Sequence, residues 1–395
     1  MLPAWLSFVI VIGVVMALSK YELGIILTFG ALGFALLAGV DILQSLINVL
    51  TDLSILALIV IMILIPILGG IMEESGLMME MIQKLRISKK SSLMMIPALF
   101  GLLPVPGGAL MSAPIVQQID TEEDANIKVS INVWYRHMLI MVYPVSSALI
   151  VASKLTNIHL YILVLGLFPC LIVMWLIGYI ILVRKVSPFT EKRERDLRRA
   201  FLNLLPIFIA PVFDFVGRTF FNFSVPEIFL LFGLIISIWL SLKLGKMKVS
   251  SVKTISKKMK IWRFPLIIFS MFLFLEVFVL SGAPAEIASL DLSVFLLIII
   301  GFFLGLGTGR IQLPISILIP IYLAQFTVLT MPLLDFIFIY TSIFLGYLIT
   351  PLHPCVAYST EYFKTSFMKV AKILGKPILV SFTILLGLYG LFLLL

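Results

Sequence analysis

Charged residues are scarce in this sequence of 395 residues. Asp, Glu, Lys and Arg make up 12% of it, whereas 61% of the residues are hydrophobic. Soluble domains contain about 25% charged residues, so a soluble fold of this composition could not cover its surface. Apolar runs of about 20 residues, the length that crosses a bilayer, recur along the whole chain. The composition therefore predicts an all-α polytopic membrane protein.

Cysteine and histidine are rare as well. The chain has two cysteines and three histidines, namely Cys170, Cys355, His137, His159 and His353. Two cysteines this far apart do not form a disulfide framework or a zinc motif. The motifs H-E-x-x-H and G-x-S-x-G and the phosphate-binding loop are also absent. We therefore expect no metal site, no cofactor and no enzymatic activity. An intramembrane enzyme is the weaker alternative and would need Ser146 or Ser147 beside a histidine.

Hydropathy predicts ten transmembrane helices, at 2–18, 23–40, 53–72, 129–153, 160–183, 200–217, 226–244, 264–281, 331–362 and 378–395. Two further apolar stretches, 93–118 and 292–326, contain Gly and Pro at their middles. Because these residues interrupt helices, we predict that both stretches are re-entrant hairpins, which enter and leave the membrane on the same side.

The basic residues indicate an orientation. If the hairpins do not cross, most of the 29 Lys and Arg residues fall on one side, chiefly in loops 184–199 and 245–263. An excess of Lys and Arg marks the cytoplasmic side. We therefore expect an inner-membrane protein with cytoplasmic basic loops and external termini. Those loops are expected to face anionic membrane lipid, not nucleic acid.

An internal repeat is visible at a shift of 206 residues. It aligns Ser75-Gly76 with Ser281-Gly282, Glu80 with Glu286, Gly101 with Gly307 and Pro114 with Pro320, and a shift of 210 aligns Pro144 with Pro354. The predicted topology has an odd number of crossings between the copies, so the second copy would be inverted. Inverted repeats with broken helices are typical of secondary transporters. The predicted regions are N-terminal scaffold helices at 1–52, repeat 1 at 53–183, linker helices and basic loops at 184–263, and repeat 2 at 264–395.

The hairpin tips are the first candidates for a binding site. Irregular backbone at membrane depth is tolerated where it is buried in protein or lines a cavity, and a helix amino end favours an anion. An arginine inside an apolar stretch is costly, so it normally has a partner or faces water, and its planar guanidinium suits a carboxylate. The alternative for Arg310 is a structural ion pair with Glu276 or Asp291. With Ser146 and Ser147, the predicted substrate-binding residues are Pro106, Gly107, Gly108, Ser112, Gly307, Thr308, Gly309, Arg310 and Gln312.

Two spans contain proline-rich breaks, Tyr143-Pro144-Val145-Ser146-Ser147 and Thr350-Pro351-Leu352-His353-Pro354-Cys355. Unwound carbonyl groups and hydroxyls can bind a cation, and a histidine can carry a coupling proton. The predicted residues for ion or proton coupling are Arg136, His137, Tyr143, Glu276, Thr350 and His353.

The Ser-Gly pair after the third span, the hairpin PVPGGALMSAP and the break TPLHPC together resemble a prokaryotic membrane family, domain of unknown function 401. That family resembles the ion-transporter superfamily of gluconate, citrate, dicarboxylate and arsenite carriers. The resemblance implies a scaffold domain, often dimeric, and a transport domain that holds both hairpins and both breaks and moves like an elevator. The tips here differ from the Ser-Asn-Thr signature of the dicarboxylate branch.

These observations predict a secondary active transporter of a small organic anion, coupled to H⁺ or Na⁺, which could assemble as a homodimer. The alternative function is a cation/proton antiporter. In that case His353, Glu276 or Asp214 would carry the proton, and Arg310 would be structural.

Overall fold

The chain folds entirely into helices within the part described. The structure is a computed structural model that describes all residues except 1, 19–20, 85–86, 103–107, 188–195 and 395. No strand occurs among the described residues. Large apolar side chains such as Leu165, Val212 and Leu379 are more than half exposed, as expected for helices that face lipid. The chain is therefore a polytopic membrane protein of the all-α class.

Eight helical segments are long and apolar enough to cross a membrane. They match eight of the ten predicted spans and are α4 (Leu53–Glu74), α8 (Ala125–Met138) with η1 (Leu139–Val142) and α9 (Ser147–Thr156), α10 (Leu160–Gly178) with η2 (Tyr179–Val183), α11 (Leu197–Phe220), α12 (Glu227–Leu244), α14 (Arg263–Leu280), α18 (Leu333–Ile349) with α19 (Pro354–Tyr362), and α20 (Phe367–Leu394).

The first two predicted spans form shorter helices. These are α1 (Ala4–Ala17) and α2 (Leu23–Ala38), with 14 and 16 residues. At 1.5 Å per residue they extend about 21–24 Å, less than the roughly 30 Å hydrocarbon thickness of a bilayer. Three short helices connect the spans: α3 (Ile42–Thr51), α5 (Leu77–Lys84) and α13 (Ser251–Lys258). A fourth, α15 (Ala283–Ala288), follows α14.

Both interrupted stretches form pairs of short helices. The first pair is α6 (Lys89–Gly101) and α7 (Gly108–Ile119), and the second is α16 (Val294–Thr308) and α17 (Gln312–Phe326). The helices of each pair pack on each other. The second tip turns at Gly309, whose φ of 61° lies in the left-handed region that glycine adopts readily. The tip of the first pair at 103–107 lies outside the described residues.

The two broken spans have the same backbone. Each break contains a four-residue turn whose second residue is a proline. In the first turn the N–H of Ser146 donates to the carbonyl of Tyr143 at 2.8 Å, and in the second the N–H of His353 donates to the carbonyl of Thr350 at 3.2 Å. The backbone dihedrals of Tyr143 and Thr350 also agree closely. Pro144 therefore corresponds to Pro351, not to Pro354. The alignment at a shift of 210 was wrong, and a shift of 207 relates the two breaks.

The predicted pairing of Gly101 with Gly307 is also wrong. A methyl group built on Gly101 would overlap the carbonyl oxygen of Arg136, and one built on Gly305 would overlap that of Ile343. Arg136 and Ile343 are also 207 residues apart. By its contacts Gly101 thus corresponds to Gly305, whereas Gly307 packs against Met16. The pairing of Gly76 with Gly282 agrees with the structure, since their φ values are 74° and 75°.

The helix contacts are reciprocal between the two series α1–α10 and α11–α20. Helix α4 packs on α12 while α14 packs on α2, and α11 packs on α5 while α1 packs on α15. In the same way α7 contacts α19 while α17 contacts α9, and α8 contacts α20 while α10 contacts α18. The correspondence thus includes the helices that precede each predicted repeat.

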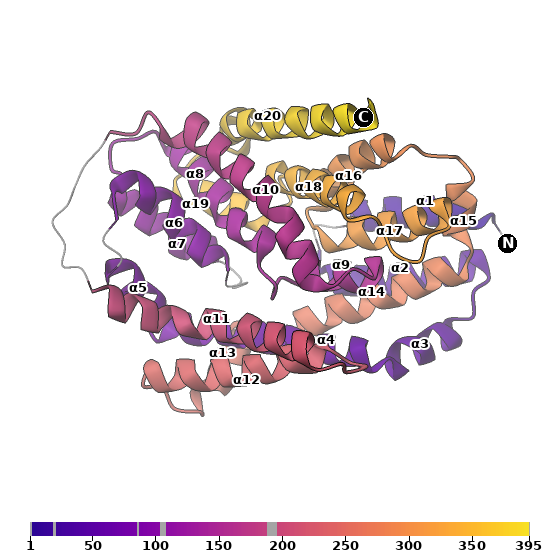
Figure 1. The fold of residues 1–395 in the computed structure, drawn as a ribbon, viewed down its shortest axis with the longest axis horizontal. Helices are drawn as coiled ribbons and strands as arrows, with labels where there is room; N and C mark the ends of the chain where they lie inside the picture. Colours follow the sequence, from indigo (N-terminus) through magenta and orange to yellow (C-terminus); the bar gives the residue numbers. More distant parts are fainter. Residues whose placement is uncertain (1, 19–20, 85–86, 103–107, 188–195, 395) are drawn as a thin grey trace.

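Figure 1 shows how these helices are distributed. Helices α4, α11, α12, α13 and α14 lie along one side of the molecule, and the pairs α6–α7 and α16–α17 lie toward opposite ends of the other side. Each broken span contacts both pairs, because α8 packs on α6 and α9 on α17, while α18 packs on α16 and α19 on α7. The fold therefore brings both breaks together with the second hairpin tip.

Candidate functional site

The starts of the half-helices make contact across the two series. The Gln312 side-chain amide at the start of α17 donates a hydrogen bond of 2.7 Å to the Ser147 hydroxyl at the start of α9. At the second tip, a Cβ on Gly309 would lie 2.8 Å from the Leu352 Cβ in the second break. The structure therefore brings the start of α17 to the start of α9 and the second tip to the second break, and a binding role for Ser147, Gly309 and Gln312 stays a prediction.

Three half-helices begin here without a side-chain cap. The residues that precede α9, α17 and α19 are Ser146, Ile311 and His353, and none of their side chains accepts a bond from the helix amino end. The first N–H groups of a helix have no partner inside it, and their dipoles favour negative charge. The dipoles of these helix ends therefore favour an anion.

Arg136 contributes the first positive charge. It lies near the end of α8 and is only 4% exposed. Its Nη1 lies 3.5 Å from the Ser112 hydroxyl of α7, a long hydrogen bond. The tight contact of Gly101 with the Arg136 carbonyl fixes the backbone at this point. The first hairpin thus holds this arginine in place.

Arg310 contributes the second charge, directly after Gly309. In the described part of the chain, neither Glu276 nor Asp291, the two carboxylates proposed as its structural partners, forms an ion pair with it. Glu276 accepts a bond of 2.7 Å from the Asn48 amide. Glu22, whose charge acts on Arg310, forms its ion pair with Arg263 at 2.8 Å. Among the described residues, no carboxylate forms an ion pair with the Arg310 guanidinium.

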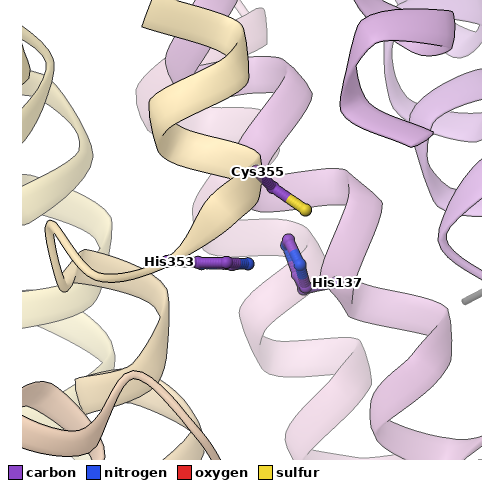
Figure 2. Close-up of side chains that lie close together, drawn as sticks. All are labelled: His137, His353 and Cys355. Carbon is purple, nitrogen blue, oxygen red and sulfur yellow. The ribbon is translucent and has the colours of Figure 1, made fainter. Parts of the chain in front are cut away.

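A cluster of rings lies beside these charges. The His137 and His353 ring centroids are 4.4 Å apart, and Tyr347 lies 4.2 Å from His353 and 5.5 Å from His137. Both Arg136 and Arg310 act electrostatically on His353 and on Tyr347. Figure 2 shows His137 and His353 pointing toward each other, with the sulfur of Cys355 beside them. We call Arg136, His137, Arg310, Tyr347 and His353 the basic cluster.

Other predicted site residues have structural contacts. The Tyr143 hydroxyl donates a 2.8 Å bond to the Ile207 carbonyl of α11. The Thr350 hydroxyl accepts from the Leu352 N–H at 3.2 Å and stabilises the turn. The Thr308 hydroxyl bonds the Leu304 carbonyl at 2.7 Å within its own helix. Glu276 lies with Asn48 near α3, and Asp214 is bonded by Arg218 and Tyr161 within and beside α11.

The remaining predictions concern the first hairpin. Gly108 begins α7, while Pro106 and Gly107 lie outside the described residues. Ser146 is 9% exposed and precedes α9. These positions stay predictions for a binding role.

Two residues in this region were not predicted. Tyr347 lies in a fully apolar stretch of α18, where an aromatic residue is typical of packing. Cys355 lies two residues after His353 in the second break. That spacing was the available signal, but the sequence did not show that His137 would lie beside both.

Comparison with known proteins shows one family. The family model described as protein of unknown function, DUF401, matches residues 2–394. No curated protein matches the chain. The family match confirms the resemblance inferred from the hairpin and the breaks, while the relation to the ion-transporter superfamily stays a prediction.

Proposed function

This chain belongs to the DUF401 family of proteins of unknown function, and we propose that it is a secondary active transporter of a small organic anion, coupled to H⁺ or Na⁺. The observation that carries the proposal is the pair of arginines in the basic cluster. Arg136 precedes His137 in the first broken span, and Arg310 follows Gly309, which packs on Leu352 next to His353; the two histidine rings are 4.4 Å apart.

An anion offers what this cluster lacks. A charge inside the membrane normally has a partner or faces water, yet no ion pair with a carboxylate is found for Arg310 among the described residues. A carboxylate ligand would supply that partner in bidentate geometry. The amino ends of α9, α17 and α19 would add N–H donors. A negatively charged solute therefore fits Arg310 and these helix ends better than a cation.

The antiporter alternative is supported by the two adjacent histidines, His137 and His353, which are both titratable. Its acidic candidates have other partners, however. Asp214 is bonded by Arg218 at 2.9 Å, and Glu276 is bonded by Asn48 at 2.7 Å. In the proposed mechanism the histidines instead carry the coupling proton where H⁺ is the coupling ion of the anion carrier.

The arrangement of helices supports an elevator-type movement. Both hairpins and both broken spans pack with one another, whereas α4 and α11 pack on α12 and α14 packs on α4, with a smaller contact between α14 and α17. We propose that the second group is the scaffold, that it forms a homodimer, and that the basic loops face the cytoplasm of an inner membrane. Enzymatic activity is not part of the proposal.

The test is thermal stabilisation of the purified protein by small carboxylates, by inorganic anions and by Na⁺. A ligand at about 100 times its Kd adds about 2.7 kcal/mol to the stability of the folded state. We expect a carboxylate to raise the melting temperature, with H⁺ or Na⁺ adding to its effect. Stabilisation by Na⁺ alone, with no response to any anion, would favour the antiporter.

A further inference from the structure

His137, His353 and Cys355 bring three metal-ligating atoms together. One imidazole nitrogen from each histidine and the cysteine sulfur all lie within 4.8 Å of one another. Figure 2 shows the three side chains converging from α8, from the second break and from the start of α19. In a three-coordinate site with metal–nitrogen distances near 2.0 Å and metal–sulfur distances near 2.3 Å, the ligand atoms are about 3.5–3.8 Å apart. Shifts of about 1 Å would thus close the site.

Each of the two histidines can offer one ring nitrogen to an ion. Nδ1 of His137 lies 2.6 Å from the Val133 carbonyl oxygen, so Nδ1 has the proton and Nε2 offers its lone pair. This arrangement of a ligating histidine held by a backbone carbonyl is usual at metal sites. His353 is fully buried, and by hydrogen-bond geometry neither of its ring nitrogens has a partner among the described residues, although the Leu348 carbonyl lies near enough to act on the ring. A buried polar group without a partner is costly, and a metal ion would supply that partner.

We propose that His137, His353 and Cys355 form a binding site for a soft monovalent metal ion, with Cu⁺ as the candidate. Imidazole and thiolate are ligands that Cu⁺ accepts, and thiolate selects it over harder ions. On binding, the sulfur–copper bond forms as the thiol proton leaves to solvent, so the charge of Cu⁺ is balanced by that of the thiolate.

Local charge decides between Cu⁺ and Zn²⁺. Arg136 and Arg310 both act on His353, and repulsion between buried cations grows with the charge of the incoming ion. A Zn²⁺ thiolate would leave an additional positive charge beside two guanidinium groups, whereas a Cu⁺ thiolate would leave none. The proposal does not depend on transport, because the ligands and their charges are present without a solute.

The experiment is an anaerobic titration of the purified protein with Cu⁺ against a chromogenic Cu⁺ chelator, without added organic anion. We expect a single tight site in the wild type. Cys355→Ser and His137→Gln should each weaken the Kd for Cu⁺ by at least about 10-fold, since even outer-shell changes at metal sites have effects of about this size. Ag⁺, a redox-inert monovalent probe, should compete with Cu⁺.

The chain provides matched controls. Cys170→Ser and His159→Gln remove the other cysteine and the remaining histidine, and neither should change Cu⁺ binding. The melting temperature of each variant without metal verifies that it is folded, and Cys355→Ser, which replaces only the sulfur, remains informative if a histidine variant fails to fold. No tight site in the wild type, an unchanged Kd in Cys355→Ser, or Zn²⁺ binding as tight as that of Cu⁺ would overturn the proposal.

Discussion

Arg310 is held by its backbone more than by its side chain. Its N–H donates to the Thr308 hydroxyl at 3.3 Å, and its carbonyl lies 3.2 Å from the same oxygen, whose proton goes to the nearer Leu304 carbonyl at 2.7 Å. This local loop follows the left-handed Gly309 and fixes the direction in which the chain leaves α16. The guanidinium can therefore change its partner while the tip keeps its shape.

Arg310→Ala should weaken binding of the transported anion and leave the protein folded. Loss of a charge-assisted hydrogen bond costs about 1.5–3 kcal/mol, which corresponds to a Kd increase of about 10- to 150-fold. The melting temperature without ligand should change little, because no ion pair is broken. Arg310→Lys keeps the charge but loses the planar guanidinium, so its affinity for the anion should lie between those of the wild type and Arg310→Ala. Strong destabilisation without ligand, together with unchanged affinity, would assign Arg310 a structural role.

Tyr143 satisfies a carbonyl group that a proline leaves without a partner. Pro211 in α11 has no N–H, so the carbonyl of Ile207, four residues earlier, receives no helical hydrogen bond. The Tyr143 hydroxyl donates to it at 2.8 Å. The first break is therefore attached to a helix of the proposed scaffold.

Tyr143→Phe should lower stability, because it leaves the Ile207 carbonyl without a donor. A buried polar group that loses its partner costs about 1–3 kcal/mol. The matched control is Tyr340→Phe. Tyr340 is 1% exposed, and its hydroxyl has no hydrogen-bond partner among the described residues, so its removal should be neutral or stabilising. Thermal unfolding in detergent measures both, and equal losses in the two variants would argue against the bond.

The sequence was informative about some residues of the site and not about others. Arg310 was recognisable because a charge in an apolar stretch is exceptional, and His353 because it lies between two prolines. Tyr347 was not, since a tyrosine among apolar residues has no pattern that separates binding from packing. The bond between Ser147 and Gln312 joins residues 165 positions apart, and such a contact depends on the packing of the whole chain.

At the scale of elements, glycines set how closely each hairpin packs on a broken span. Gly101 of α6 lies against the Arg136 carbonyl, and Gly305 of α16 lies against the Ile343 carbonyl. Gly346 of α18 lies in turn against the Phe302 carbonyl of α16. Small residues allow such close backbone approach between membrane helices. These contacts position Arg136 and the second tip.

Gly101→Ala and Gly305→Ala should both destabilise the protein, because the added methyl group overlaps a backbone carbonyl that cannot rotate away. Overpacking of this kind typically costs about 1–3 kcal/mol. Gly387 in α20 provides the control, since a Cβ there meets nothing within 4 Å. Gly387→Ala should be neutral or stabilise by about 0.5–1 kcal/mol, as alanine is the better helix former. Melting temperatures that fall equally in all three variants would contradict the packing argument.

Element limits were predictable where composition alone decides them. The eight long helical segments follow from hydropathy, and the two hairpins from their central Gly and Pro. The correspondence of the breaks was misjudged because Thr350-Pro351-Leu352-His353-Pro354 offers two prolines as partners for Pro144, and only the turn hydrogen bonds separate them. Helix α20 begins at Phe367, before the predicted limit of 378, since Pro377 is accommodated inside the helix.

At the scale of the whole molecule, the reciprocal contacts are those expected from two copies of one fold. Helix α4 of the first series packs on α12 of the second, and α14 packs on α2. Helix α13 precedes α14, and α15 follows it. If the copies are inverted, α13 and the connection after α15 lie on opposite sides of the membrane. The positive-inside rule predicts that α13 lies on the cytoplasmic side, because α13 and its flanks are rich in lysine.

Single-cysteine labelling tests this orientation in intact cells. In a background with Cys170 and Cys355 replaced, a cysteine at Ser289, which is exposed after α15, should react with an impermeant maleimide. A cysteine at Ser251, the first residue of α13, should react only after the cells are opened. Each variant must retain the melting temperature of the background, so that failure to react reports sidedness. Labelling at Ser251 from outside without labelling at Ser289 would reverse the orientation. Labelling of both from outside would contradict the inverted repeat, because the two positions are expected on opposite sides of α14.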